Sequence, residues 1–137
     1  ERVFTEALSA AAHPVEDAPA VLAALSPRYK LCVATNGLSS MQAGRLAPLS
    51  PFLCRTFISE EMGFIKPNPA FFRAMTEELG AESSRCLMVG DSLGSDVAGA
   101  NAAGMDCVWF NRSGAPLPPA YRVKAVISHL NELLEIL

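Results

Sequence analysis

Residues 86–104 read CLMVGDSLGSDVAGANAAG, and this stretch gives the strongest indication of the fold. It opens with an apolar run of strand length, turns at Gly90, and continues into a helix predicted over 95–103. The small side chains of that helix would let it pack close to a sheet. Two carboxylates, Asp91 and Asp96, stand on the loop between strand and helix.

Apolar runs of the same length recur along the chain, each followed by a helical pattern. Runs without alternation are typical of strands that are buried on both faces of a parallel sheet. Strands are therefore predicted at 31–34, 56–58, 86–89 and 107–110, with a weaker one at 125–127. Such an alternation of strands and helices with short links predicts an α/β fold with right-handed crossovers.

The remaining helices are predicted from their start and stop signals. Asn68 is a candidate N-cap with Pro69 at the first helical position, and Gly80 ends that helix. Further helices are predicted over 2–12, 17–25 and 129–137, the last capped by Ser128, and a short one from Ser39 or Ser40 to Pro48.

The composition narrows the class of protein. The chain has 137 residues, of which 50% are hydrophobic and 18% charged, which fits one globular domain rather than a disordered tail. The net charge is −3 and the basic residues are scattered, so nucleic acid and membrane are poor candidate partners. No signal peptide or C-x-x-C pair occurs, and the four cysteines are interpreted as reduced, buried thiols. We therefore expect a cytoplasmic protein.

Ligands of such α/β folds bind beyond the carboxyl ends of the strands, so the residues that stand there are the candidates for function. Thr35 and Asn36 follow the first strand, Lys66 follows the second, and Asp91 and Asp96 follow the third. All except Asp91 have an ordinary alternative: a strand-to-helix turn for Thr35 and Asn36, a solvated lysine for Lys66, and a helix cap for Asp96. Together they place a hydroxyl, a cation and an acid pair suited to Mg²⁺ at neighbouring strand ends, which suits phosphoryl transfer.

The motifs VATNG, KP and GDSLGSD, in this order, resemble motifs II, III and IV of phosphohydrolases of the haloacid dehalogenase (HAD) superfamily. The resemblance implies a Rossmann-like HAD core with a mostly parallel sheet, and Mg²⁺-dependent hydrolysis of phosphate monoesters through an aspartyl-phosphate. By it, Thr35, Asn36 and Lys66 bind phosphate, Asp91 and Asp96 serve the metal, and Lys66 and Asp96 are the candidate catalytic residues. The sequence around the motifs is most similar to the branch of the pyrimidine 5′-nucleotidases. A small phosphorylated metabolite is the expected substrate, with a nucleoside monophosphate as one candidate.

The superfamily's motif I, D-x-D, which carries its nucleophile, does not occur among the four Asp of the chain. We therefore expect a core over 15–137 that is incomplete at its N-terminus, and we interpret 1–14 as the remnant of a cap-domain helix. The 137 residues alone are expected not to hydrolyse phosphate esters. A non-catalytic remnant that binds metal, phosphate or a partner is the alternative. A receiver domain is disfavoured because Thr and Lys precede the acids, and neither G-x-G-x-x-G nor a P-loop is present.

Overall fold

The computed structural model describes residues 2–6, 18–36 and 50–137. Within these residues, six parallel strands form one sheet in the order β3-β2-β1-β4-β5-β6. The strands are β1 (Arg2–Glu6), β2 (Tyr29–Thr35), β3 (Arg55–Ile58), β4 (Cys86–Gly90), β5 (Asp106–Phe110) and β6 (Ala125–Ile127). The predicted α/β class and the five predicted strands are confirmed. Because all the pairings are parallel, the carboxyl ends of the strands share one edge of the sheet.

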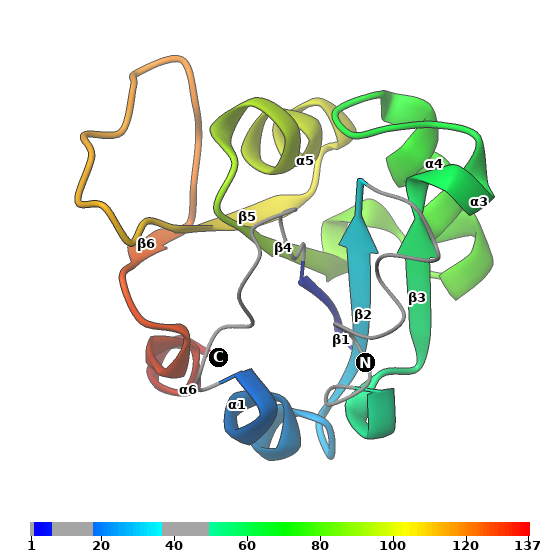
Figure 1. The fold of residues 1–137 in the computed structure, drawn as a ribbon, viewed down its shortest axis with the longest axis horizontal. Coiled ribbons are helices and arrows are strands. Elements are labelled where there is room, and N and C mark those ends of the chain that lie inside the picture. Colours follow the sequence, from blue (N-terminus) through cyan, green and yellow to red (C-terminus); the bar gives the residue numbers. More distant parts are fainter. Residues whose placement is uncertain (1, 7–17, 37–49) are drawn as a thin grey trace.

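Helices cover both faces of this sheet (Figure 1). On one face lie α1 (Ala18–Leu25) and α6 (Leu133–Ile136), and on the other α3 (Ser59–Met62), α4 (Pro69–Leu79) and α5 (Ala98–Ala103). Short 3₁₀ turns occur at Ser50–Phe52, Ser83–Arg85 and Leu130–Glu132, and a π-helical turn at Leu93–Val97 leads into α5.

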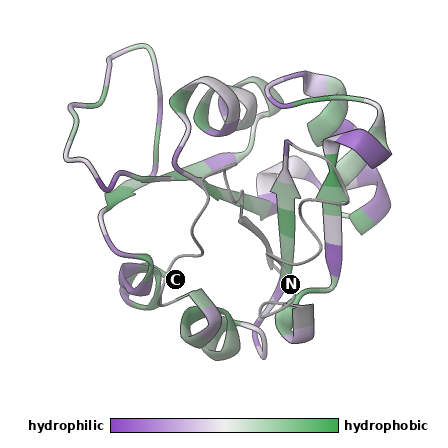
Figure 2. Cartoon of the chain, viewed as in Figure 1, coloured by the Kyte–Doolittle hydropathy of each residue, from purple (hydrophilic) through white to green (hydrophobic). Residues whose placement is uncertain are grey.

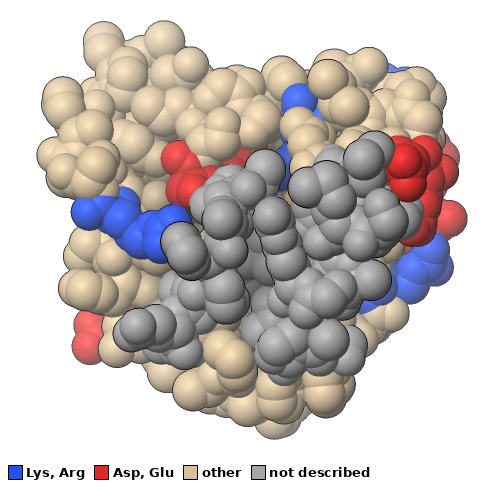
Figure 3. All heavy atoms as spheres, viewed as in Figure 1, with Lys and Arg blue, Asp and Glu red and all other residues tan. Residues whose placement is uncertain are grey.

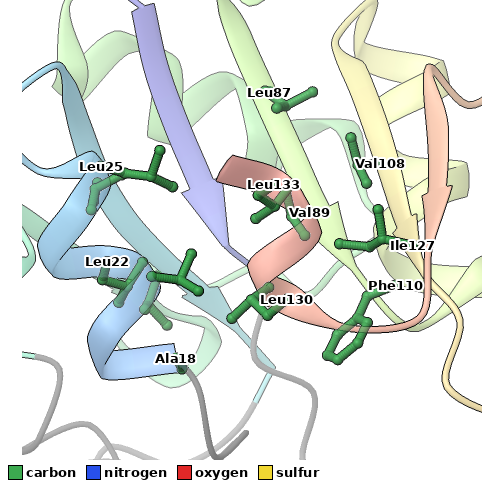
Figure 4. Packing of buried hydrophobic residues seen from close by; sticks show 13 residues of the cluster. Ala18, Leu22, Leu25, Leu87, Val89, Val108, Phe110, Ile127, Leu130 and Leu133 are labelled. Carbon is green, nitrogen blue, oxygen red and sulfur yellow. The ribbon is translucent and has the colours of Figure 1, made fainter. Parts of the chain in front are cut away.

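Alternate side chains of β2, β4 and β5 enter two separate cores. Leu31 and Val33 of β2 belong to a core with Leu22, Leu25 and Leu133, which is seen from close by in Figure 4. Their neighbours Cys32 and Ala34 point to the opposite core, whose largest members are Phe71, Phe72 and Met75 of α4. Because both faces of the strands are apolar, their ribbons are mostly green in the hydropathy colouring (Figure 2).

Helices α4 and α5 pack closely because α5 carries Gly99. A Cβ added at Gly99 would lie 2.3 Å from Cε2 and 2.4 Å from Cζ of the fully buried Phe72 ring. Alanine would otherwise favour a helix by about 1 kcal/mol over glycine. The small side chain is therefore a packing requirement at this position.

We expect Gly99→Ala to lower the free energy of unfolding by about 1–2 kcal/mol, because overpacking the core outweighs the gain in helix propensity. Urea denaturation measures this change. The double variant with Phe72→Leu should lose less than the sum of the two single variants. Additive losses would contradict a contact between these two residues.

The helix predicted over 2–12 is wrong for Arg2–Glu6, and residues 7–12 lie outside the described residues. Arg2–Glu6 forms β1, which pairs with β2 and β4 in the middle of the sheet. The sequence RVFTE has β-branched and aromatic residues that favour a strand. The backbone of β1 also satisfies the hydrogen-bonding groups of both neighbouring strands. A strand without an aspartate thus occupies the middle of the sheet.

Other sequence-based predictions have mixed outcomes. The side chain of Asn68 caps α4 by accepting from the Ala70 N–H at 2.9 Å, and Gly80 ends the helix in a left-handed conformation, as predicted. The predicted C-terminal helix is broken into a 3₁₀ turn and α6, and the helix predicted between Ser39 and Pro48 lies outside the described residues. Cys32, Cys86 and Cys107 are buried as predicted, but Cys54 is exposed.

On the face shown in Figure 3, outside the grey atoms, Lys and Arg occur in small separate groups. This arrangement agrees with the scattered basic residues of the sequence. Among the described residues, no helix has both the length and the apolar character that crossing a bilayer requires.

Candidate active site

Asn36 and Lys66 are joined by two reciprocal hydrogen bonds. The Asn36 Nδ2 donates to the Lys66 carbonyl oxygen at 3.0 Å, and the Lys66 backbone N–H donates to Asn36 Oδ1 at 2.8 Å. The Lys66–Pro67 peptide bond is cis, and α4 begins two residues beyond it. Asn36, the residue after β2, therefore fixes the backbone of the loop between α3 and α4.

The Lys66 side chain spans from β2 to the loop after β4. Its Nζ donates to the Ala34 carbonyl oxygen at 3.0 Å and to Asp96 Oδ1 at 2.6 Å. The side chains of Lys66 and Asp96 are 2% and 0% exposed, respectively. Burial raises the pKa of Asp96, while the charge and the hydrogen bond of Lys66 oppose the increase. Removing one partner of such a buried ion pair lowers the free energy of unfolding by several kcal/mol, because the other charge stays buried without compensation.

Asp96 is also held by the loop that precedes it. Its Oδ2 accepts from the Ser92 N–H at 3.2 Å, while the Ser92 Oγ accepts from the Ser95 N–H at 3.2 Å at the start of the π-helical turn. A Cβ at Gly90 would lie 2.3 Å from Asp96 Oδ2 and 2.5 Å from its Cβ. The glycine at the end of β4 is therefore needed for the close approach of the Asp96 carboxylate.

Asp91 follows directly after β4, at the same edge of the sheet. The indole Nε1 of Trp109 in β5 donates to the Asp91 carbonyl oxygen at 3.1 Å, which anchors the backbone of this residue. The charge of Asp91 adds to the rise in the pKa of Asp96, so the two carboxylates are close enough to interact. Trp109 lies in the strand predicted over 107–110, and no pattern in the sequence indicated its contact with Asp91.

Thr35 is the last residue of β2 and is fully buried. Its Oγ1 donates to the Asn36 carbonyl oxygen over 3.4 Å, a long and weak hydrogen bond. It directly follows Ala34, whose carbonyl oxygen receives the Lys66 ammonium. The structure thus brings Thr35, Asn36 and Lys66 to the edge of the sheet where Asp91 and Asp96 stand.

The sequence also matches a known protein family. Residues 2–104 match the model of the haloacid dehalogenase-like hydrolases. The chain belongs to the haloacid dehalogenase-like hydrolase family. This confirms the resemblance drawn from the three sequence motifs.

Relatives of the chain include nucleotidases and phosphatases of this hydrolase family. The pyrimidine 5′-nucleotidase PynA of Streptococcus pneumoniae is 41% identical over 86 residues, which are 61% of this chain and 36% of PynA. The pyrimidine 5′-nucleotidase YjjG of Escherichia coli is 34% identical over 137 residues, which are 98% of this chain and 61% of YjjG. The chain therefore spans less than two thirds of the length of these curated relatives.

Solved structures of the family share the fold. The putative HAD-hydrolase YfnB of Bacillus subtilis, solved with bound magnesium, superposes with a TM-score of 0.85 at 33% identity, over 89% of this chain and 55% of YfnB. A HAD phosphatase of Thermococcus onnurineus gives a TM-score of 0.79 at 32% identity, over 88% of this chain and 56% of that one. The Rossmann-like HAD core is thus the fold of this chain.

The candidate ligands for Mg²⁺ at this edge of the sheet are carboxylates. The described residues contain no group of three or more His, Cys, Asp or Glu that could hold a metal ion. They do provide two neighbouring carboxylates, Asp91 and Asp96, and Mg²⁺ commonly takes one or two carboxylates while it keeps water or substrate oxygens. Both oxygens of Asp96 accept hydrogen bonds within the protein, from Lys66 and from Ser92. The donor set fits Mg²⁺ in this form.

An open pocket lies beside Asn36. It has a volume of about 670 Å³ and is lined by Asn36, Glu60, Phe64 and Ile65, among other residues. Phe64 and Ile65 are 41% and 62% exposed, which is high for large apolar side chains. The pocket is thus contiguous with Asn36 and has one apolar wall.

Proposed function

We propose that this chain supplies the phosphate-binding and Mg²⁺-binding part of a phosphatase that hydrolyses phosphate monoesters of small metabolites. The observation that carries the proposal is the buried Lys66, whose ammonium lies between the end of β2 and Asp96. Nucleotidases and phosphatases among the relatives support the same reaction class. A pyrimidine nucleoside monophosphate is the first substrate to test, because PynA and YjjG are named pyrimidine 5′-nucleotidases.

Lys66 is suited to bind a phosphoryl oxygen. An ammonium group has three N–H donors, and within the described residues two of them are used, by Ala34 and by Asp96. The third can donate to an anionic oxygen beyond the carboxyl end of β2. Thr35 and Asn36 stand at that strand end, so a hydroxyl and backbone N–H groups can complete the phosphate site.

The two carboxylates take different roles in this proposal. Asp91 contributes an oxygen to Mg²⁺, and Asp96 orients Lys66 and supports the metal through water. When bound, Mg²⁺ neutralises negative charge on the transferring phosphoryl group. Trp109 keeps the Asp91 backbone in place during this binding through its hydrogen bond to the carbonyl oxygen.

The nucleophile is not provided by this sequence, because its Asp residues are Asp17, Asp91, Asp96 and Asp106 and none forms a D-x-D motif. The central strand of the sheet, β1, has the sequence RVFTE and contains no aspartate. Hydrolysis through an aspartyl-phosphate therefore requires a carboxylate from the remainder of a longer protein. We expect the 137 residues alone to bind ligands without turnover.

The pocket beside Asn36 offers room for the leaving group of the substrate. Phe64 and Ile65 provide an apolar wall, against which a flat ring can pack. Glu60, which also lines it, provides a carboxylate for hydroxyl or amino groups of the substrate. These features support a polar metabolite with a ring, such as a nucleoside monophosphate.

Calorimetric titration of the chain with Mg²⁺ and with inorganic phosphate tests the proposal. We expect Asp91→Asn to weaken Mg²⁺ binding by about tenfold or more, because one of two carboxylates is lost. The matched control is Asp106→Asn, which removes an exposed carboxylate at the amino end of β5, at the opposite edge of the sheet. Equal Mg²⁺ affinity of the two variants would refute the site.

Hydrolysis assays with p-nitrophenyl phosphate and with pyrimidine nucleoside monophosphates address the second part of the proposal. We expect no turnover above background from the 137 residues, and turnover from a longer form of the protein that includes a D-x-D strand. Hydrolysis by the 137 residues that disappears in Asp91→Asn would show that the nucleophile lies within this sequence.

A further inference from the structure

The thiols of Cys32 and Cys54 lie next to each other, although they are 22 positions apart in the sequence. Their sulfur atoms are 3.4 Å apart. Cys32 lies in β2 and Cys54 immediately precedes β3, its neighbour in the sheet (Figure 1). Nothing in the phosphatase site uses either thiol.

The backbone fixes this proximity. The Cys54 N–H donates to the Leu31 carbonyl oxygen at 2.8 Å, and Cys32 is paired with Arg55 in the ladder of β2 and β3. The Arg55 guanidinium in turn forms an ion pair with Glu78 of α4. The pairing of β2 with β3 therefore keeps the two sulfur atoms close to each other.

The two thiols differ in accessibility. Cys54 is exposed, so a dissolved reagent can reach it, while Cys32 is fully buried in the core below α4. Burial and the hydrogen bond with Cys54 raise the pKa of the Cys32 thiol. Cys32 thus keeps its proton and is shielded from solvent, and Cys54 is the thiol that an oxidant meets first.

We propose that Cys32 and Cys54 form a redox-active pair, which a hydroperoxide converts into an intramolecular disulfide between β2 and the start of β3. Closure brings the sulfur atoms from 3.4 Å to the bonding distance of about 2.05 Å, a movement that side-chain rotation and a small backbone shift can provide. A dithiol reductant reverses the bond.

The chemistry proceeds in two balanced steps. The Cys54 thiolate attacks one oxygen of hydrogen peroxide, the O–O bond breaks and hydroxide leaves, which gives a sulfenic acid. The Cys32 sulfur then attacks the Cys54 sulfur, the S–O bond breaks, and the departing oxygen leaves as water with the Cys32 proton. Two thiols are oxidised, and the peroxide is reduced to two molecules of water.

The disulfide would enclose the segment that carries Thr35 and Asn36. Cys32 is three positions before Thr35 in the same strand, so the bond would anchor the strand that positions Thr35 and Asn36. A loop of this length, closed by a bond, restricts the unfolded chain and stabilises the folded one. Oxidation should therefore strengthen the fold around β2.

Intact-mass spectrometry and thermal unfolding of the chain before and after hydrogen peroxide test the proposal. We expect the loss of two hydrogen atoms per chain, a linked pair of peptides containing Cys32 and Cys54, and a rise in the unfolding midpoint of roughly 5–10 °C. Dithiothreitol should reverse all three changes.

Three variants make the test specific. Cys54→Ser, at an exposed position, should abolish the disulfide and the thermal shift. Cys32→Ala should leave Cys54 as a sulfenic acid that dimedone labels. Cys86→Ala, the control at another buried thiol, should behave like the unaltered chain. A sulfinic or sulfonic acid on Cys54 of the unaltered chain, or a dimer linked through Cys54, would overturn the proposal, as would a disulfide that persists in Cys54→Ser.

Discussion

Lys66→Met should lower the free energy of unfolding by about 3–5 kcal/mol, because it leaves the Asp96 carboxylate buried without its cation. Methionine keeps most of the aliphatic length of lysine, so the loss reflects the charge rather than a cavity. The total stability of a domain is about 5–15 kcal/mol, so the variant should be close to unfolding. Urea denaturation, with the midpoint and the slope fitted separately, measures the change.

Two further variants separate the ion pair from a general effect of removing a lysine. Lys30→Met removes an exposed lysine of β2 and should change stability by less than about 0.5 kcal/mol. Lys66→Met combined with Asp96→Asn should recover part of the loss, because the second change removes the uncompensated charge. If Lys66→Met were as stable as Lys30→Met, the buried pair would not exist in solution.

Gly90→Ala should destabilise the chain by about 3 kcal/mol and weaken Mg²⁺ binding. The added methyl group would overlap the Asp96 carboxylate, with 2.3 Å to Oδ2 and 2.5 Å to Cγ, so Asp96 would have to leave its contacts with Lys66 and Ser92. Asp96 is 0% exposed and β4 is buried throughout, so neither the Asp96 side chain nor the β4 backbone can move into solvent to relieve the overlap. Urea denaturation and calorimetric Mg²⁺ titration measure the two effects.

Gly94→Ala is the matched control for this variant. Gly94 lies four residues after Gly90, in the π-helical turn, and a Cβ there would meet no atom within 4 Å. Its stability should stay within about 0.5 kcal/mol of the unaltered chain. Similar losses in Gly90→Ala and Gly94→Ala would mean that backbone flexibility, rather than the position of Asp96, explains the effect.

The sequence predicted most of the sheet, because buried parallel strands appear as uninterrupted apolar runs. It also predicted the beginning and end of α4, where Asn68, Pro69 and Gly80 act through local hydrogen bonds and backbone preferences. Arg2–Glu6 was wrongly predicted, because a short segment has little periodicity and its conformation is decided by the strands on either side. The β-branched and aromatic residues of RVFTE agree with the strand that this pairing forms.

Within the site, the sequence identified residue types and strand ends, but it could not give the contacts between them. That Lys66 binds a phosphate stays a prediction. The structure shows that its ammonium joins Ala34 of β2 to Asp96, which follows β4. The hydrogen bonds from Asn36 to the Lys66 backbone cross 30 positions of sequence. Contacts of this kind depend on the strand order, which no local pattern contains.

Trp109 is the one tryptophan in the chain, and its indole N–H donates to the carbonyl oxygen of Asp91. Indole emission is sensitive to nearby charge and to hydrogen bonding, so the intrinsic fluorescence of the protein comes from a chromophore coupled to the acidic end of β4. Trp109 fluorescence can therefore report the binding of a cation or an anion at this edge of the sheet without an added label.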